Sequence, residues 1–268
     1  MPPLSAIPLP GFAPATILHE DSRFLAIDKP AGLPCAAPDA APDAPSLERL
    51  LESAVAAHAP WAEERGIRSL RIVRPLDSEV GGVLLLARAP GSRLTFAHAI
   101  EERRARSEFL VVVGGKPPKR RWTSCLKLRP DPDHPDRMLT HTRLGQFAET
   151  DFEVLGHGDG MALLLARPFT HRPHQIRAHL AATALPILGD TLYGFGRRAP
   201  LKQPGILPRS EPATQRSRPL PLALRAARLA FECPFTREPV DIQAPLDAFL
   251  ADYGFEVGSA DSDDSDEP

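Results

Sequence analysis

The sequence has few of the residues that build disulfide frameworks, and no long apolar run. Its 268 residues include three Cys, three Met, two Trp and two Tyr. The cysteines are odd in number and far apart in the chain, which argues against a disulfide framework and a zinc knuckle. The longest apolar run, around 83–87, is far too short to cross a bilayer, and the N-terminus lacks the basic and apolar segments of a signal peptide. We therefore expect a soluble, cytoplasmic protein with no membrane partner.

Proline is the residue type that the chain has in excess. Its 31 Pro make up about 12% of the residues, more than twice ordinary usage, yet Gly and Pro together stay near 18%, below the range of low-complexity sequences. Hydrophobic residues at 43% and charged residues at 25% are typical of a globular protein. The length suits one large domain or two small ones.

Short β-like runs and helical patterns mix along the chain without regular alternation. Ser46 is expected to cap a helix over 47–55, because apolar residues recur there at helical spacing. Pro173 suits the first position of another helix. The expected strands are 16–19, 24–27, 71–73, 82–87, 108–113, 151–155, 162–166 and 226–231, and the other helices are 92–104, 173–183 and 245–253. This order favours an α+β fold.

The charge distribution divides the chain into a body and a tail. The formal net charge is −2, and the last eleven residues carry five acids without a base. We expect a Pro-rich, poorly ordered lead-in at 1–14, one folded domain at 15–256, and a disordered acidic tail at 257–268. Without the tail the body is positive, at about +3.

Two stretches of the body are strongly basic. Residues 116–129 hold six Lys or Arg and no acid, and residues 195–223 hold six against Glu211 alone. Each stretch by itself is typical of a solvated loop, but two of them, with an interleaved Trp, favour binding of a polyanion. The candidate contact residues are Lys116, Lys119, Arg120, Arg121, Trp122, Arg197 and Arg198.

Three histidines lie between His171 and His179. Neither an HExxH motif nor a second ligand cluster accompanies them, so we expect no metal site. One interpretation is polar packing at the start of a helix. The other is a helix N-terminus at which His174 and Arg177, three residues apart on one face, present positive charge to an anion.

Asp77 lies in a loop just before Gly81, Gly82 and an apolar strand. Two interpretations are open. The Asp caps a turn, or it is a carboxylate that the strand holds over a cleft, as a nucleophile would be held.

Taken in order, these segments resemble the RluA-type family of pseudouridine synthases. The likeness covers most of residues 16–250. It rests on 18–32, which ends in Lys-Pro-Ala-Gly, on 76–88, on 108–114 and on 170–194. The last segment is close to the family's pattern Arg-Thr-His-Gln-Ile-Arg-x-His-Leu followed by Pro-x-x-Gly-Asp-x-x-Tyr-Gly, which is too long and specific to match by chance.

The resemblance implies a fold, a reaction and two site residues. The fold would be α+β, a mixed, mainly antiparallel sheet with flanking helices, and 15–256 would be its catalytic domain. The activity would be isomerisation of uridine to pseudouridine in ribosomal or transfer RNA by a monomer, without metal, redox or nucleotide cofactor. Asp77 would be the essential carboxylate, and Arg177 its ion-pair partner, which favours the charged form of the Asp.

The sequence departs from the family's pattern in the loop before Asp77 and at Phe109, among other positions. The family's usual His-Arg-Leu-Asp reads Arg74-Pro75-Leu76-Asp77 here, so Arg74 is the candidate to assist base flipping in place of the missing Arg. The usual active-site Tyr is Phe109, which stacks on uracil but transfers no proton. Arg74, Phe109 and His174 are the expected substrate-binding residues. The alternative is a catalytically impaired relative that only binds RNA, although such a protein has no physical need for the Asp77/Arg177 pair.

Overall fold

The computed structural model describes residues 6–100, 105–134, 136–141, 143–194 and 220–256. The chain divides into two compact units, Met1–Phe109 with Arg225–Ala244, and Leu110–Leu224 with Pro245–Pro268. The boundaries fall inside strand β6 (Ala105–Gly114) and at the start of strand β11 (Leu224–Glu232). The single domain expected at 15–256 stays a prediction.

The first unit is built around a sheet in the order β1-β2-β3-β5-β11, with β4 on β5 and β12 on β11. These strands pair in the antiparallel direction, except β5 with β11, which are parallel. The other elements of this unit are β1 (Ala6–Ile7), β2 (Ala15–Glu20), β3 (Phe24–Lys29), β4 (Arg71–Ile72), β5 (Gly81–Ala87), β12 (Pro239–Gln243), α1 (Leu47–Ala56), α2 (Pro60–Glu63) and α3 (Pro90–Ala99).

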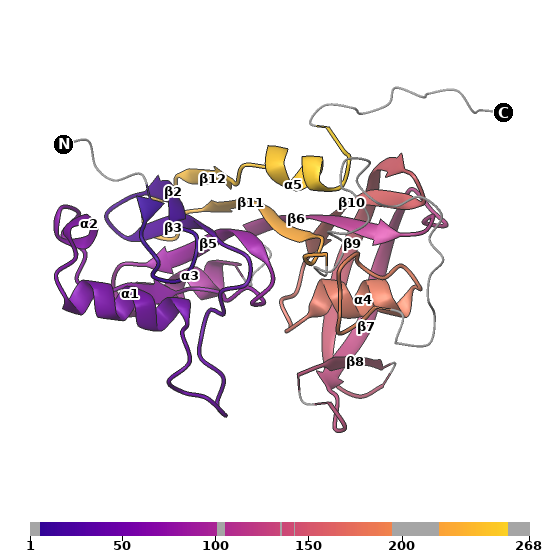
Figure 1. The fold of residues 1–268 in the computed structure, drawn as a ribbon, viewed down its shortest axis with the longest axis horizontal. Coiled ribbons are helices and arrows are strands. Elements are labelled where there is room, and N and C mark those ends of the chain that lie inside the picture. The colour runs from indigo at the N-terminus through magenta and orange to yellow at the C-terminus, as the bar shows by residue number, and fades with distance from the viewer. Residues whose placement is uncertain (1–5, 101–104, 135, 142, 195–219, 257–268) are drawn as a thin grey trace, which may run out of the picture. The chain divides into compact units, whose positions relative to one another are not determined.

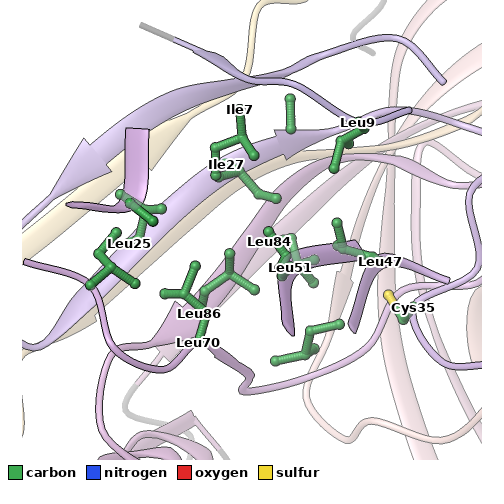
Figure 2. Packing of buried hydrophobic residues seen from close by; sticks show 14 of the residues in the cluster. Ile7, Leu9, Leu25, Ile27, Cys35, Leu47, Leu51, Leu70, Leu84 and Leu86 are labelled. Carbon is green, nitrogen blue, oxygen red and sulfur yellow. The ribbon is translucent and has the colours of Figure 1, made fainter. Parts of the chain in front are cut away.

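Both faces of β3 and β5 are covered, because successive side chains of a strand point to opposite sides. Leu25 and Leu84 join a cluster with Leu47 and Leu51 of α1 (Figure 2). Phe24 points to the opposite face of the sheet. There it joins a second cluster with residues of α3 and β11. All seven residues of β5 are buried, as expected of a strand covered on both sides.

The lead-in expected to be poorly ordered contributes to this unit. Ala6–Ile7 forms β1 and pairs with β2. Ile7 and Leu9 are buried in the cluster of Figure 2. Their apolar side chains stabilise the segment, which offsets its high proline content.

The second unit holds a sheet in the order β6-β10-β9-β7-β8, with α4 packed against it (Figure 1). Leu128, Ala148 and Ala178 form a small core between the sheet and this helix. The elements are β7 (Arg121–Pro130), β8 (Met138–His141), β9 (Gln146–Gly158), β10 (Met161–Pro168), α4 (Gln175–Ala182) and α5 (Asp247–Asp252).

The structure confirms the predicted fold class and corrects several elements. The sheet is mixed and mainly antiparallel, with flanking helices. The α3 helix ends at Ala99, and the rest of the helix expected at 92–104 reaches into residues outside the described ranges. Strands β7, β8 and β12 were not predicted. In β7 the polar residues of the exposed face obscured the alternation, so the strand was interpreted as part of a basic loop.

The helix expected to begin at Pro173 begins two residues later. His174 adopts a left-handed backbone conformation with φ of 52°, and α4 starts at Gln175. The Gln175 side chain accepts a hydrogen bond from the Arg172 backbone N–H at 3.1 Å, which stabilises the turn before the helix. Within the described ranges, no helix is both long and apolar enough to span a bilayer.

Candidate active-site residues

Asp77 belongs to the first unit and lies in the loop that leads into β5. Its carbonyl accepts a hydrogen bond from the Val80 N–H at 3.1 Å, which forms a tight turn. The next carbonyl, that of Ser78, accepts from the Gly32 N–H at 2.8 Å and from the Lys29 ammonium at 3.1 Å. The backbone beside Asp77 is thus anchored, while the residue itself stays partly exposed.

Lys29, at the end of β3, is the residue that joins this loop to the Lys-Pro-Ala-Gly turn. Its side chain is fully buried, and its ammonium donates to the carbonyls of Leu33 at 2.6 Å, Pro30 at 3.0 Å and Ser78. An ammonium has three N–H donors, so each donor has one acceptor here. Burial lowers the pKa of Lys29, and the negative charge of Asp77 is among the groups that work against this shift.

The Gly81–Gly82 pair that follows is required by close packing. A Cβ on Gly82, whose φ is +119°, would lie 2.1 Å from the Ala226 carbonyl oxygen. A Cβ on Gly81 would lie 3.0 Å from the carbonyl oxygen of Lys29. The glycines therefore let β5 approach β11 and the Lys29 turn at the point where the Asp77 loop ends.

The other two predicted site residues of this unit are Arg74 and Phe109. Arg74 is partly buried in the same loop, three residues before Asp77. Phe109 lies on β6 and is also partly exposed. Its neighbour Glu108 is buried and accepts a 3.4 Å hydrogen bond from Arg228.

Arg177 belongs to the second unit and is almost completely buried, with 2% of its surface exposed. Its Nε donates to Asp190 Oδ2 at 2.8 Å and its NH2 donates to Asp190 Oδ1 at 2.9 Å. The Asp190 carboxylate also accepts from the backbone N–H groups of Leu192 and Tyr193, both at 2.9 Å. Burial works to raise the pKa of Asp190, but the hydrogen bonds and charge of Arg177 outweigh it and hold the pKa below its ordinary value.

The Tyr193 ring lies between Arg177 and His174. The guanidinium carbon of Arg177 is 5.3 Å from the ring centroid, within the range of a cation–π contact. The Tyr193 hydroxyl accepts from the Met138 N–H at 2.6 Å and lies 3.1 Å from His174 Nδ1. The spacing had predicted that His174 and Arg177 share one face of a helix. This was wrong, because His174 precedes α4. Both residues instead contact the Tyr193 ring.

A second hydrogen-bond network supports α4 from β9. The Gln175 amide donates to Thr150 Oγ1 at 2.8 Å and to the Glu149 carbonyl at 3.0 Å. Thr150 Oγ1 also lies 3.1 Å from His179 Nδ1, within hydrogen-bond distance. His179 is fully buried, and this burial lowers its pKa to about 4, which favours the neutral imidazole. Of the two interpretations of the three-histidine segment, His179 therefore fits polar packing.

The basic stretch 116–129 has a mixed environment. Lys116, Lys119 and Arg120 are exposed between β6 and β7. Arg121 is ion-paired with Glu153. Trp122 stacks on Phe152, with ring centroids 5.1 Å apart.

Arg197 and Arg198 of the second basic stretch, and the acidic tail, lie outside the described residues. Among the residues that the structure describes, no group of three or more His, Cys, Asp or Glu could hold a metal ion.

Sequence reasoning assigned no role to Lys29, Asp190 or Tyr193. All three lie inside the motifs on which the family resemblance rests, and this was the one sequence feature that could have pointed to them. Each of them, however, also has a partner 13 to 55 residues away in the chain, and spacing alone does not reveal such contacts.

The family model "RNA pseudouridylate synthase" matches residues 23–182 of this chain. An uncharacterized RNA pseudouridine synthase of Zymomonas mobilis subsp. mobilis is 29% identical over 242 residues, which are 89% of this chain and 97% of the relative. The mitochondrial pseudouridylate synthase RPUSD4 of Xenopus tropicalis is 27% identical over 257 residues, covering 86% of this chain and 76% of the relative.

Solved structures show the same fold. Human RNA pseudouridylate synthase domain containing 4 superposes with a TM-score of 0.66 at 23% identity, over 88% of this chain and 90% of that chain. Human RNA pseudouridylate synthase domain containing 1 gives a TM-score of 0.62 at 22% identity, over 86% and 83%. Given the family match across more than half of its length, the chain belongs to the RNA pseudouridylate synthases, isomerases that act on RNA.

Proposed function

We propose that this chain, as a cytoplasmic monomer, isomerises a uridine of structured ribosomal or transfer RNA, with Asp77 as the catalytic carboxylate and Arg177 as its ion-pair partner. The observation that carries the proposal is the anchored loop at Asp77, where Lys29 and Gly32 hold the adjacent Ser78 carbonyl. Relatives named as ribosomal large subunit pseudouridine synthases, from Nitrosomonas europaea and Haemophilus ducreyi, support ribosomal RNA as the first candidate.

The reaction breaks the bond between uracil N1 and ribose C1′ and forms a bond between C5 and C1′. C5 loses a proton and N1 gains one, so the composition of the RNA is unchanged. An ionised carboxylate serves this reaction either by attacking C1′ or by taking a proton from the sugar. Both routes need the carboxylate at a fixed place, and an anchored loop backbone provides that.

Arg177 is suited to stabilise a carboxylate because its own position is fixed. Two of its nitrogens bind Asp190, and its guanidinium carbon lies 5.3 Å from the centroid of the Tyr193 ring. A guanidinium stays charged at any physiological pH, so it favours the ionised form of a neighbouring carboxyl group.

The substrate base has to leave its stack before it reaches the carboxylate. We assign the holding of the flipped uridine to three residues. Phe109 stacks on the uracil, and Arg74 and His174 contact its phosphates or fill the gap that it leaves. Phe109 lacks a hydroxyl, so no proton transfer is assigned to it.

The test maps pseudouridines in total RNA from cells of the source organism with and without this protein. Cells lacking it are complemented with wild type, Asp77→Asn or Asp39→Asn, the last an exposed Asp of the same unit. We expect one or a few sites to disappear without the protein and to return with wild type and Asp39→Asn. With purified protein on that RNA, Asp77→Asn should be slower by more than about 10³-fold, as for loss of a principal catalytic group.

Two results would contradict the proposal. Detectable turnover by Asp77→Asn would assign the chemistry to another group. Unchanged pseudouridines in cells lacking the protein, together with tight RNA binding in vitro, would favour the catalytically impaired relative that only binds RNA.

A further inference from the structure

The turn between β8 and β9 presents two large apolar side chains to solvent. Leu144 is 55% exposed and Phe147, at the start of β9, is 47% exposed. The backbone N–H groups of Arg143 and Leu144 are held by His141, whose Nδ1 accepts them at 2.9 Å and 3.0 Å. An aromatic ring is thus exposed on an ordered part of the second unit.

Three cationic residues lie next to Phe147 in the structure. Lys127 of β7 is the direct cross-strand partner of Phe147, so the two side chains lie on the same face of the sheet. The Lys127 ammonium donates to the Arg143 carbonyl at 3.0 Å. From the other side, Arg172 Nε donates to the Phe147 carbonyl at 3.2 Å.

The local charge is positive. Lys127, Arg143 and Arg172 supply three cations. Three acids share the Phe147 face of β9, of which Glu149 is the nearest to Phe147 in the strand; Asp151 and Glu153 lie further along it, where Glu153 is paired with Arg121 and Arg167. An exposed aromatic ring beside several cations matches a single-stranded nucleic acid, in which bases stack and phosphates carry the charge. The turn therefore fits RNA better than it fits an apolar protein surface, against which three cations would have to be desolvated.

The same segment is tied to the loop that precedes α4. The Glu149 N–H donates to Thr170 Oγ1 at 2.9 Å, and the Glu149 carbonyl accepts from the Phe169 N–H at 2.9 Å and from the Gln175 amide. Gln175 lies two residues before Arg177 on α4. A base stacked on Phe147 would therefore be held at a fixed distance from the helix that carries Arg177.

We propose that these five residues, Lys127, Arg143, Leu144, Phe147 and Arg172, form an RNA-binding platform, with an unpaired base stacked on Phe147 and the cations at neighbouring phosphates. The proposal deepens the proposed function and rests on it, since the RNA is taken to be the substrate of the same chain. Of the basic stretch 116–129, the platform uses only Lys127.

The first experiment compares Phe147→Ala with Leu155→Ala, a matched control that removes a 39% exposed apolar side chain from the same strand. The probes are an oligouridylate of about 12 nucleotides, within the site size of single-strand binders, and a fully paired RNA hairpin. We expect Phe147→Ala to bind the oligouridylate about 5- to 100-fold more weakly, the range for loss of one stacked base. Binding of the hairpin, and both affinities of Leu155→Ala, should stay close to wild type.

Two further variants report on stacking and charge directly. Tryptophan fluorescence of Phe147→Trp should be quenched by oligouridylate, and that of Leu155→Trp should respond no more than wild type does. Arg143→Gln should lower the slope of log affinity against log salt by about 0.7, the value for one phosphate contact on a single strand.

Equal affinities of wild type and Phe147→Ala for oligouridylate, with no quenching of Phe147→Trp, would overturn the platform. Equal weakening by Leu155→Ala would overturn it as well, because the effect would not be local to Phe147. Binding needs no turnover, so the failures are separable. If Phe147→Ala binds normally and wild type isomerises RNA, the platform alone fails; if Phe147→Ala loses binding and no isomerisation occurs, the catalytic assignment alone fails.

Discussion

The two proposed catalytic residues are supported in opposite ways. Asp77 is a partly exposed residue whose neighbouring backbone is fixed, through the Ser78 carbonyl, by a buried ammonium and a backbone N–H. Arg177 is a buried residue whose side chain itself is fixed, by a two-point ion pair with Asp190 and by the Tyr193 ring.

This difference follows from what each group has to do. A carboxylate that meets substrate has to remain accessible, so its position is set through the main chain. A buried guanidinium has to be neutralised where it lies, because an uncompensated buried charge is strongly destabilising. We therefore expect damage around Arg177 to appear mainly in stability, and damage around the Asp77 loop to appear mainly in turnover.

Asp190→Asn should give the largest loss of stability. It removes the carboxylate that neutralises buried Arg177, and breaking such a pair from one side costs about 3–5 kcal/mol in the free energy of unfolding. Urea unfolding of the variant measures this loss. Asp159→Asn, an exposed Asp of the same unit, should change stability by less than about 0.5 kcal/mol. Equal stability of the two variants would mean that Asp190 is not the group that neutralises Arg177.

The pH dependence of stability should report on His179. Burial lowers its pKa in the folded protein to about 4 from an ordinary 6.5, so the unfolded chain binds the extra proton between these values. The free energy of unfolding should rise as the pH increases from 4 to 6.5. Above pH 6.5 His179 should contribute no further pH dependence. The whole increase from His179 should be at most about 3 kcal/mol. The depressed pKa of Asp190 acts below its ordinary 3.8, outside this window.

Unfolding free energies at pH 7.5 and 5, for wild type and His179→Gln, test this expectation. The variant should lose most of the slope between the two pH values. A slope that persists in the variant would assign the effect to other groups.

Lys29→Met should have the smallest effect on stability and a larger one on turnover. It removes the Lys29 donor from the Leu33 and Pro30 carbonyls and one of the two donors from the Ser78 carbonyl, which costs about 1–3 kcal/mol. It also removes a buried cation, which offsets part of the loss. The loop is then held at Ser78 by the Gly32 N–H alone, so single-turnover isomerisation should fall more than about tenfold, since small misplacements of catalytic groups are costly. Arg68→Met, an exposed cation of the same unit, is the control. A stability loss above that of Asp190→Asn, with normal turnover, would reverse the comparison.

Much of the fold was readable from local pattern. Ser46 caps α1 as expected, accepting from the Arg49 N–H at 3.4 Å. The apolar runs at 24–27 and 82–87 predicted strands, which are β3 and β5 in the structure. The motif at 170–194 indicated the family, which the comparisons confirm. These features depend on neighbours in the chain, so spacing and residue type are sufficient to find them.

The tertiary structure decided the features that depend on distant partners. β7 forms because Trp122 packs on Phe152 and its strand pairs along β9; its own composition resembles a solvated loop. His174 leaves the helix because of the turn that precedes α4, where Gln175 bonds back to Arg172. The partner of Lys29 at Ser78 lies 49 residues away.

The sequence by itself thus determined the family, the fold class and the candidate reactive groups, because these reside in residue identity and short-range order. Only the tertiary structure decided that Arg177 is buried against Asp190, that Lys29 fixes the loop of Asp77, and that Phe147 is exposed among cations. The physical reason is that burial and ion pairing depend on which residues meet in space, and residues far apart in the chain are brought together only by the packing of the sheet and its helices.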